Sequence, residues 1–140
     1  MQYDLIVVGS GPGGYVAAIR AAQLGMKTAV VEEAELGGIC LNWGCIPTKA
    51  LLKSAQVFEY INHAADYGVA LEGAAKPRIE DMVKRSREVA AGMSKGIQFL
   101  FKKNKIDHLN GRGIIMPGKQ VEVTSPEGDK TIYQASHIII

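Results

Sequence analysis

Two short, mostly apolar runs bracket an alanine-rich stretch at the start of the chain. Residues 3–8 and 27–31 have the near-continuous hydrophobic character typical of strands buried on both faces. Between them, Tyr15–Leu24 predicts a helix, and Gly25 suits the position just after a helix end. The order strand, glycine-rich turn, helix and strand predicts a βαβ unit with parallel strands and a right-handed crossover.

The middle of the chain predicts two further helices. Residues 33–46 are expected to form a loop, after which Pro47 suits the first position of a helix that continues over residues 48–61. Residues 62–77 have no regular pattern. Apolar residues at helical spacing then predict a long helix from Arg78 to about Lys103.

The last third of the chain changes to short strands. Turn signals such as Asn-Gly and Pro-Gly separate four short runs and predict an antiparallel meander over residues 106–109, 113–116, 120–124 and 130–133. The isoleucines at 138–140 predict the start of a further buried parallel strand, and we expect a continuation beyond Ile140. The fold class predicted is α/β, a parallel sheet with helices plus an antiparallel β-meander.

Length and charge narrow the range of functions. The 140 residues fit one domain, and a net charge of +2 offers no clustered basic surface for nucleic acid. Lys102, Lys103 and Lys105 are expected to form a solvated helix end that the helix dipole favours. The sequence has no run of about 18 apolar residues for a membrane span, and Leu5–Val8 is too short for a signal peptide. A cytoplasmic location, without membrane or nucleic-acid partners, is therefore expected.

The glycine-rich turn after the first strand carries a nucleotide-binding pattern. Gly9, Gly11 and Gly14 match G-x-G-x-x-G, and Glu32 ends the next strand. In this context the first glycine permits the turn, the second lets the backbone approach a pyrophosphate, and the third allows close packing of helix on strand. The helix N-terminus favours phosphate, and Glu32 can accept hydrogen bonds from ribose hydroxyls. The pattern predicts dinucleotide binding but does not separate FAD from NAD.

Both cysteines of the chain, Cys40 and Cys45, lie in one short segment. Zinc would need about four ligands, and the three histidines are scattered without metal-binding spacing. A structural disulfide that closes so small a loop would stabilise the fold only modestly. A redox-active pair is the favoured interpretation, because a helix beginning near Pro47 would favour a thiolate at Cys45. Lys49 lies about one helical turn later, where it could stabilise negative charge or simply be solvated.

The segment from Gly37 to Lys49 reads Gly-Gly-Ile-Cys-Leu-Asn-Trp-Gly-Cys-Ile-Pro-Thr-Lys. It resembles the redox-disulfide motif of the flavoprotein disulfide reductases, and the resemblance extends along all 140 residues, most strongly over 5–52. Within that family, Leu-Asn-x-Gly-Cys-Ile-Pro resembles the dihydrolipoamide dehydrogenases. Glutathione and mercuric reductases more often carry Val where Leu41 and Ile46 stand here.

The resemblance implies a Rossmann-like domain with FAD as the cofactor. The cofactor-binding residues that it implies are Gly9, Gly11, Gly14, Glu32, Gly38, Cys40, Lys49 and Gly113. It also implies three catalytic roles. Cys40 would exchange with a dithiol substrate, Cys45 would lie against the isoalloxazine ring, and Lys49 would lie near the flavin N5.

The implied activity is oxidation of protein-bound dihydrolipoamide, with electrons passing through the cysteine pair and FAD to NAD. The implied partners are lipoyl domains of 2-oxo acid dehydrogenase complexes or of the glycine cleavage system, and a second copy in a homodimer. Chains of this family are several times longer and include NAD and dimerisation domains. Residues 1–140 are thus expected to form the N-terminal portion of the FAD-binding domain, without turnover by themselves. Another flavoprotein disulfide reductase is the alternative.

Two positions depart from the pattern of the family. Ile39 stands where threonine is common, so a hydroxyl contact to the cofactor is lost. Trp43 stands where valine is common, and we expect it to serve packing. The histidines, His63, His108 and His137, are expected to be ordinary surface or packing residues.

Overall fold

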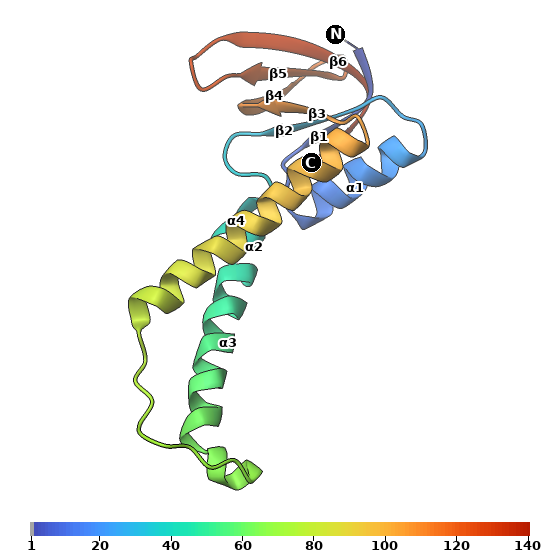
Figure 1. Ribbon diagram of the computed structural model, residues 1–140. Helices are drawn as coiled ribbons and strands as arrows, with labels where there is room; N and C mark the ends of the chain where they lie inside the picture. The colour runs from blue at the N-terminus through green and yellow to red at the C-terminus, as the bar shows by residue number, and fades with distance from the viewer. Residues whose placement is uncertain (1) are drawn as a thin grey trace.

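The computed structural model describes residues 2–140, which form one six-stranded sheet with helices (Figure 1). β1 (Gln2–Val8), α1 (Pro12–Gln23) and β2 (Thr28–Glu32) make the predicted βαβ unit, and the two strands are parallel. α1 begins three residues earlier than predicted, because Pro12 occupies its first turn, where no backbone N–H is needed. The residue after its C-cap is Gly25, as predicted, with a φ of +89°.

The sheet has the strand order β3-β2-β1-β6-β5-β4. β3 (Asp107–Asn110) is parallel to β2 and does not belong to the antiparallel meander, so this part of the prediction was wrong. The physical reason is the connection. β3 is reached from β2 through helices, and a helical crossover returns the chain parallel to the preceding strand.

β4 (Arg112–Met116) and β5 (Gln120–Thr124) form the predicted antiparallel pair. β6 (Lys130–Ile139) is one strand where two were predicted. Its first half pairs antiparallel with β5, and its second half pairs parallel with β1. No glycine or proline interrupts these ten residues, so the chain stays extended across both partners.

The terminal isoleucines are less buried than predicted. Ile138 packs on the sheet beside Ile6, whereas Ile139 and Ile140 are exposed, so the expected buried strand is wrong for these last two residues. The alternation of a strand explains this difference, since Ile139 points away from Ile138.

The segment after β2 is more regular than predicted. A short helix α2 (Gly38–Asn42) lies within the expected loop, and α3 (Cys45–Asn62) begins two residues before Pro47. A single 3-10 turn, η1 (Ala64–Tyr67), interrupts the irregular segment, and α4 (Ile79–Lys103) matches the predicted long helix. Lys102 and Lys103 occupy its last turn and are exposed, as predicted.

Two apolar clusters cover the two faces of the parallel strands. On one face, Leu5, Val7 and Val30 pack against α1 and against Ile97 and Phe101 of α4. The other face carries a cluster in which β1 and β2 side chains meet the hairpin strands, formed by Tyr3, Ile6, Ala29, Val31, Val121, Val123 and Ala135. The carboxyl ends of β1 and β2 therefore lie between the helices and the hairpin.

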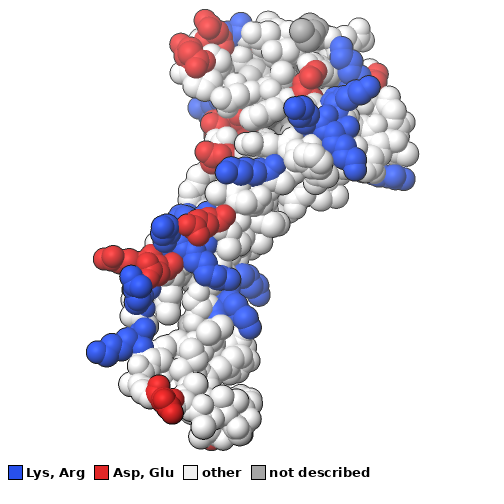
Figure 2. All heavy atoms as spheres, in the orientation of Figure 1, with Lys and Arg blue, Asp and Glu red and all other residues white. Residues whose placement is uncertain are grey.

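A helical arm leaves this body. Figure 1 shows α3 and the first half of α4 side by side, directed away from the sheet. The side chain of Arg85 on α4 donates a hydrogen bond to the carbonyl of Ala50 on α3, at 2.9 Å. Figure 2 shows charged side chains along the arm and over the sheet end, and a tip with few charges. Within residues 2–140, no helix has the length and apolar character needed to cross a membrane.

Candidate functional site

The glycine-rich turn joins β1 to α1 at the carboxyl edge of the sheet. Gly9 has a φ of +98°, which favours glycine, and its N–H donates to the carbonyl of Val31 on β2. A Cβ on Gly14 would strike the backbone of Gly9, so the third glycine of the pattern is needed for the turn itself. A Cβ on Gly11 would meet no atom within 4 Å. The fold therefore does not require glycine at position 11, and the space in front of it is open to a ligand.

The N-terminus of α1 has the character of an anion site. Gly11 is its N-cap, no side chain caps it, and its first turn contains no acidic residue. The unpaired N–H groups and the positive end of the helix dipole both favour a phosphate at this position.

Glu32 ends β2 beside this turn and is held by three donors. Its Oε2 accepts hydrogen bonds from the Ser10 backbone N–H at 3.0 Å and from the Ser10 hydroxyl at 2.7 Å. Its Oε1 accepts from the Ala34 N–H at 3.0 Å. Burial tends to raise the pKa of Glu32, but these donors outweigh it and lower the pKa below its ordinary value. The carboxylate is thus ionised at neutral pH and keeps further lone pairs for a ligand.

A hollow of about 220 Å³ lies next to this carboxylate, between the two strand ends and the hairpin. Glu32, Glu33, Arg112 and the backbones of Gly9, Gly111 and Gly113 help to line it. A Cβ on Gly113 would approach Val31 and Val8 to 3.1 and 3.3 Å, so glycine lets β4 lie close over β1 and β2. Gly111 is equally constrained, with a φ of +145° and its N–H bonded to the Glu32 carbonyl.

The cysteines form a disulfide at the junction of two helices. Cys40 lies in α2 and Cys45 is the first residue of α3, with their Cα atoms 4.8 Å apart. Cys40 is half-buried against the core, whereas Cys45 is exposed. Lys49 is exposed on α3, one turn after Cys45. The three predicted catalytic residues thus lie in α2 and the start of α3, and their roles stay predictions.

Side chains that sequence reasoning did not assign hold this segment. The buried Asn42 side chain donates from Nδ2 to the carbonyls of Glu35, Leu36 and Gly38, at 3.4, 3.1 and 3.0 Å. Two side chains of α4 add to this support. Ser94 donates to the Leu36 carbonyl at 2.7 Å, and Arg87 donates to the Asn42 carbonyl at 3.0 Å. Long-range bonds of this kind leave no local signal in a sequence.

Gly38 joins the cysteine segment to the glycine-rich turn. Its φ is +61°, and a Cβ there would lie 2.9 Å from the Gly11 Cα and 3.2 Å from the Gly11 nitrogen. Gly37 before it also has a positive φ and packs against Leu41 and Ile97. The backbone of the cysteine segment therefore touches the backbone of the open turn, so a ligand at the turn would lie beside the cysteines.

The two departures from the family pattern are both exposed. Ile39 is 75% exposed, and Trp43 is 55% exposed beside a hollow lined by Arg87 and Lys95. Trp43 is the C-cap of α2 and lies outside the buried core, so its expected packing role stays a prediction.

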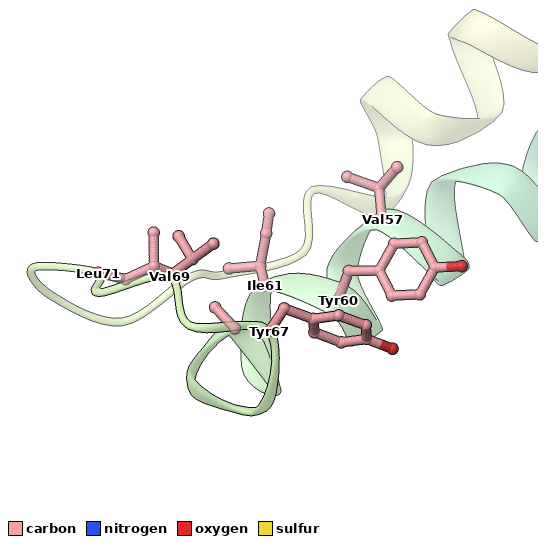
Figure 3. Close-up of a pocket in the computed structure, with 7 residues that line it drawn as sticks. Val57, Tyr60, Ile61, Tyr67, Val69 and Leu71 are labelled. Atoms are coloured by element: carbon pink, nitrogen blue, oxygen red, sulfur yellow. The ribbon is translucent and has the colours of Figure 1, made fainter.

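The tip of the arm holds another hollow, of about 380 Å³ (Figure 3). It is lined by apolar and aromatic residues at the end of α3, in η1 and in the following loop: Val57, Tyr60, Ile61, Ala64, Tyr67, Val69 and Leu71. Figures 1 and 3 together place it at the far end of the arm from the disulfide. It does not belong to the site around the glycine-rich turn.

The donor set of this site suits a dinucleotide rather than a metal. Among residues 2–140, no three His, Cys, Asp or Glu side chains gather as metal ligands. The open face of Gly11, the uncapped α1 N-terminus and the carboxylate of Glu32 instead fit a pyrophosphate and a ribose. Gly38, two residues before Cys40, lies against Gly11, so the start of the cysteine segment adjoins these groups.

Comparison with known proteins agrees with this geometry. The chain is 54% identical to a dihydrolipoyl dehydrogenase of Rhizobium etli and 49% identical to one of Zymomonas mobilis, in each case over 99% of its length. It is 42% identical to a leghemoglobin reductase of Vigna unguiculata. The chain spans 32%, 30% and 27% of these relatives, so it matches about a third of their length or less. Residues 3–140 match the pyridine nucleotide-disulphide oxidoreductase family, and the chain belongs to that family.

Proposed function

We propose that this chain supplies the FAD-binding and disulfide-bearing part of a dihydrolipoyl dehydrogenase. The observation that supports the proposal is the backbone contact between Gly38 and Gly11, which joins the segment that bears the Cys40–Cys45 disulfide to the turn that would bind phosphate. The similarity to dihydrolipoyl dehydrogenases over 99% of the chain supports the choice of activity within the family.

The residues of the glycine-rich turn would hold the cofactor. Gly11 and the α1 N-terminus take the pyrophosphate, and Glu32 accepts the hydroxyls of the adenosine ribose. The hollow between Glu32 and Gly113 takes the adenosine end. Lys49 offers its ammonium group to the flavin side of the disulfide. When bound, FAD supplies a two-electron acceptor that restores the disulfide and passes a hydride to NAD.

The cysteines would accept electrons from the dithiol by thiol–disulfide exchange. A substrate thiolate attacks the Cys40 sulfur and forms a mixed disulfide, while the Cys40–Cys45 bond breaks and Cys45 leaves as a thiolate. The positive end of the α3 dipole stabilises that leaving thiolate, since Cys45 is the first residue of the helix. The second substrate thiol then attacks the substrate sulfur of the mixed disulfide, the bond to Cys40 breaks, and Cys40 leaves as a thiolate that takes up the proton of the attacking thiol. The substrate leaves as a cyclic disulfide, and both cysteines are reduced.

The substrate and partners belong to the same proposal. A dihydrolipoyl group carried by a lipoyl domain is the dithiol, with the domain coming from a 2-oxo acid dehydrogenase complex or from the glycine cleavage system. A homodimer is the proposed assembly, as the family resemblance implies. A test is reduction of NAD by dihydrolipoamide with purified full-length enzyme that contains this chain. Serine at either cysteine should abolish this activity, and activity retained in both variants would refute the role of the disulfide.

The cofactor site can be tested separately with Gly11→Val. Nothing lies within 4 Å of a Cβ at this position, so the variant should fold normally yet block the approach of the pyrophosphate. Gly92→Val on α4 is the matched control, because its Cβ also meets open space. We expect FAD content to fall at least tenfold in Gly11→Val alone, measured after identical purification. Equal FAD content in all three proteins, with equal urea midpoints, would show that FAD does not bind at this turn.

A further inference from the structure

Ser10 occupies a position that the dinucleotide pattern leaves open to any residue. Its side chain is fully buried, with 0% exposure, between the glycine-rich turn and the start of the cysteine segment. The hydroxyl donates to Glu32 Oε2 at 2.7 Å and accepts from the Gly37 backbone N–H at 3.1 Å. One buried hydroxyl therefore bonds two elements that are separate in sequence.

The same residue also fixes the carboxylate through its backbone. The Ser10 N–H donates to the same Oε2 at 3.0 Å, so two donors of one residue hold one oxygen of Glu32. The Ala34 N–H holds the other oxygen. Because hydrogen bonds to an ionised acceptor are short and directional, this set restricts the Glu32 side chain to one orientation.

The Gly37 N–H gives the hydroxyl a second role. Gly37 has a φ of +100° and is followed by Gly38, whose backbone lies against Gly11. Without an acceptor, the buried Gly37 N–H would lose its partner, which is costly inside a protein. The hydroxyl therefore holds the start of the cysteine segment and the Glu32 carboxylate in one fixed arrangement.

We propose that Ser10 is a positioning residue for the adenosine ribose, which acts by holding the Glu32 carboxylate in the orientation that accepts the ribose hydroxyls. This inference rests on the proposed dinucleotide function of the site. Ser10 does not need to touch the ligand for this role. Its contribution should therefore show in how the protein discriminates between riboses, rather than in binding as a whole.

The test compares the affinities of ADP and 2′,3′-dideoxy-ADP, which differ only in the ribose hydroxyls. Calorimetry on the flavin-free protein gives the ratio of the two dissociation constants for wild type, Ser10→Ala, Glu32→Gln and their double variant. We expect a preference of roughly tenfold or more for ADP in wild type, the size of a hydrogen bond to a charged group. Ser10→Ala should reduce this preference at least threefold, and should change nothing further once Glu32 is Gln.

Ser94→Ala is the matched control for a purely structural effect. Ser94 is also a buried serine, and its hydroxyl donates to the same segment at Leu36, without contact to Glu32. Both alanine variants should lower the urea midpoint, but only Ser10→Ala should change the ratio. An unchanged ratio in Ser10→Ala, or an equal change in Ser94→Ala, would refute the positioning role while the proposed function stands. A wild-type protein that binds neither nucleotide, or both equally, would overturn both proposals.

Discussion

Replacement of Gly38 by alanine tests whether the cysteine segment and the glycine-rich turn are joined backbone to backbone. The new methyl group would lie 2.9 Å from the Gly11 Cα, and neither atom belongs to a flexible side chain. The residue also has a φ of +61°, where alanine costs about 1–2 kcal/mol relative to glycine. Overpacking adds about 1–3 kcal/mol. We expect the free energy of unfolding to fall by about 2–5 kcal/mol, a large share of the total for a small domain.

Urea unfolding followed by circular dichroism measures this loss, with the slope of the transition as a check that the same surface is exposed. Gly92→Ala is the control, because its Cβ meets open space within α4 and alanine favours a helix by about 0.5–1 kcal/mol. The control should be slightly more stable than wild type. A loss below about 0.5 kcal/mol in Gly38→Ala would show that the turn yields easily, and that the contact does not set the position of the cysteines.

Three further predictions concern the groups around this junction. Because the pKa of Glu32 is lowered in the folded protein, its carboxylate stabilises the fold above its ordinary pKa of about 4.3, and this contribution is lost as pH falls through the lower folded pKa. Urea midpoints measured from pH 3 to 7 should therefore fall less steeply at acid pH in Glu32→Gln than in wild type. Asn42→Ala should cost about 2 kcal/mol in the same assay, because it removes the side-chain donor from the Glu35 and Gly38 carbonyls, while the Leu36 carbonyl keeps Ser94. Asn42→Asp should cost more because it sets a carboxylate against these carbonyls, and equal losses would contradict this account. In the reduced, flavin-free protein, iodoacetamide should modify Cys45 faster than Cys40 at pH 7, because Cys45 is exposed at a helix N-terminus. Single-cysteine variants would measure the two rates, and the reverse order would argue against the dipole effect.

The parts of the fold that depend on local patterns could be predicted from the sequence. The βαβ unit followed from two apolar runs and a glycine-rich turn, and the long helix followed from its periodicity. The chain's family was also predicted correctly from the cysteine segment, as the match over residues 3–140 confirms. These features are encoded by neighbouring residues, so they can be inferred without a partner elsewhere in the chain.

Features that depend on distant partners were missed. The pairing of β3 with β2 depends on where α4 ends relative to the sheet, and no residue of β3 marks the strand as parallel. The segment around α2 is held by the α4 side chains of Ser94 and Arg87, which lie far from it in sequence. Ser10 was overlooked because the dinucleotide pattern specifies no residue type at that position. Tertiary contacts, rather than propensity, determine these elements.

The two partners of β1 have a consequence for how the chain folds during synthesis. Among residues 2–140, β1 is the first strand to be synthesised, and β2, which follows it closely, can cover only one of its edges. The other edge pairs with β6, which follows every other strand of residues 2–140. Until then, β1 retains an open edge of unpaired backbone groups, the kind of surface that recruits strands from other chains. The growing chain should therefore depend on chaperone protection until β6 emerges.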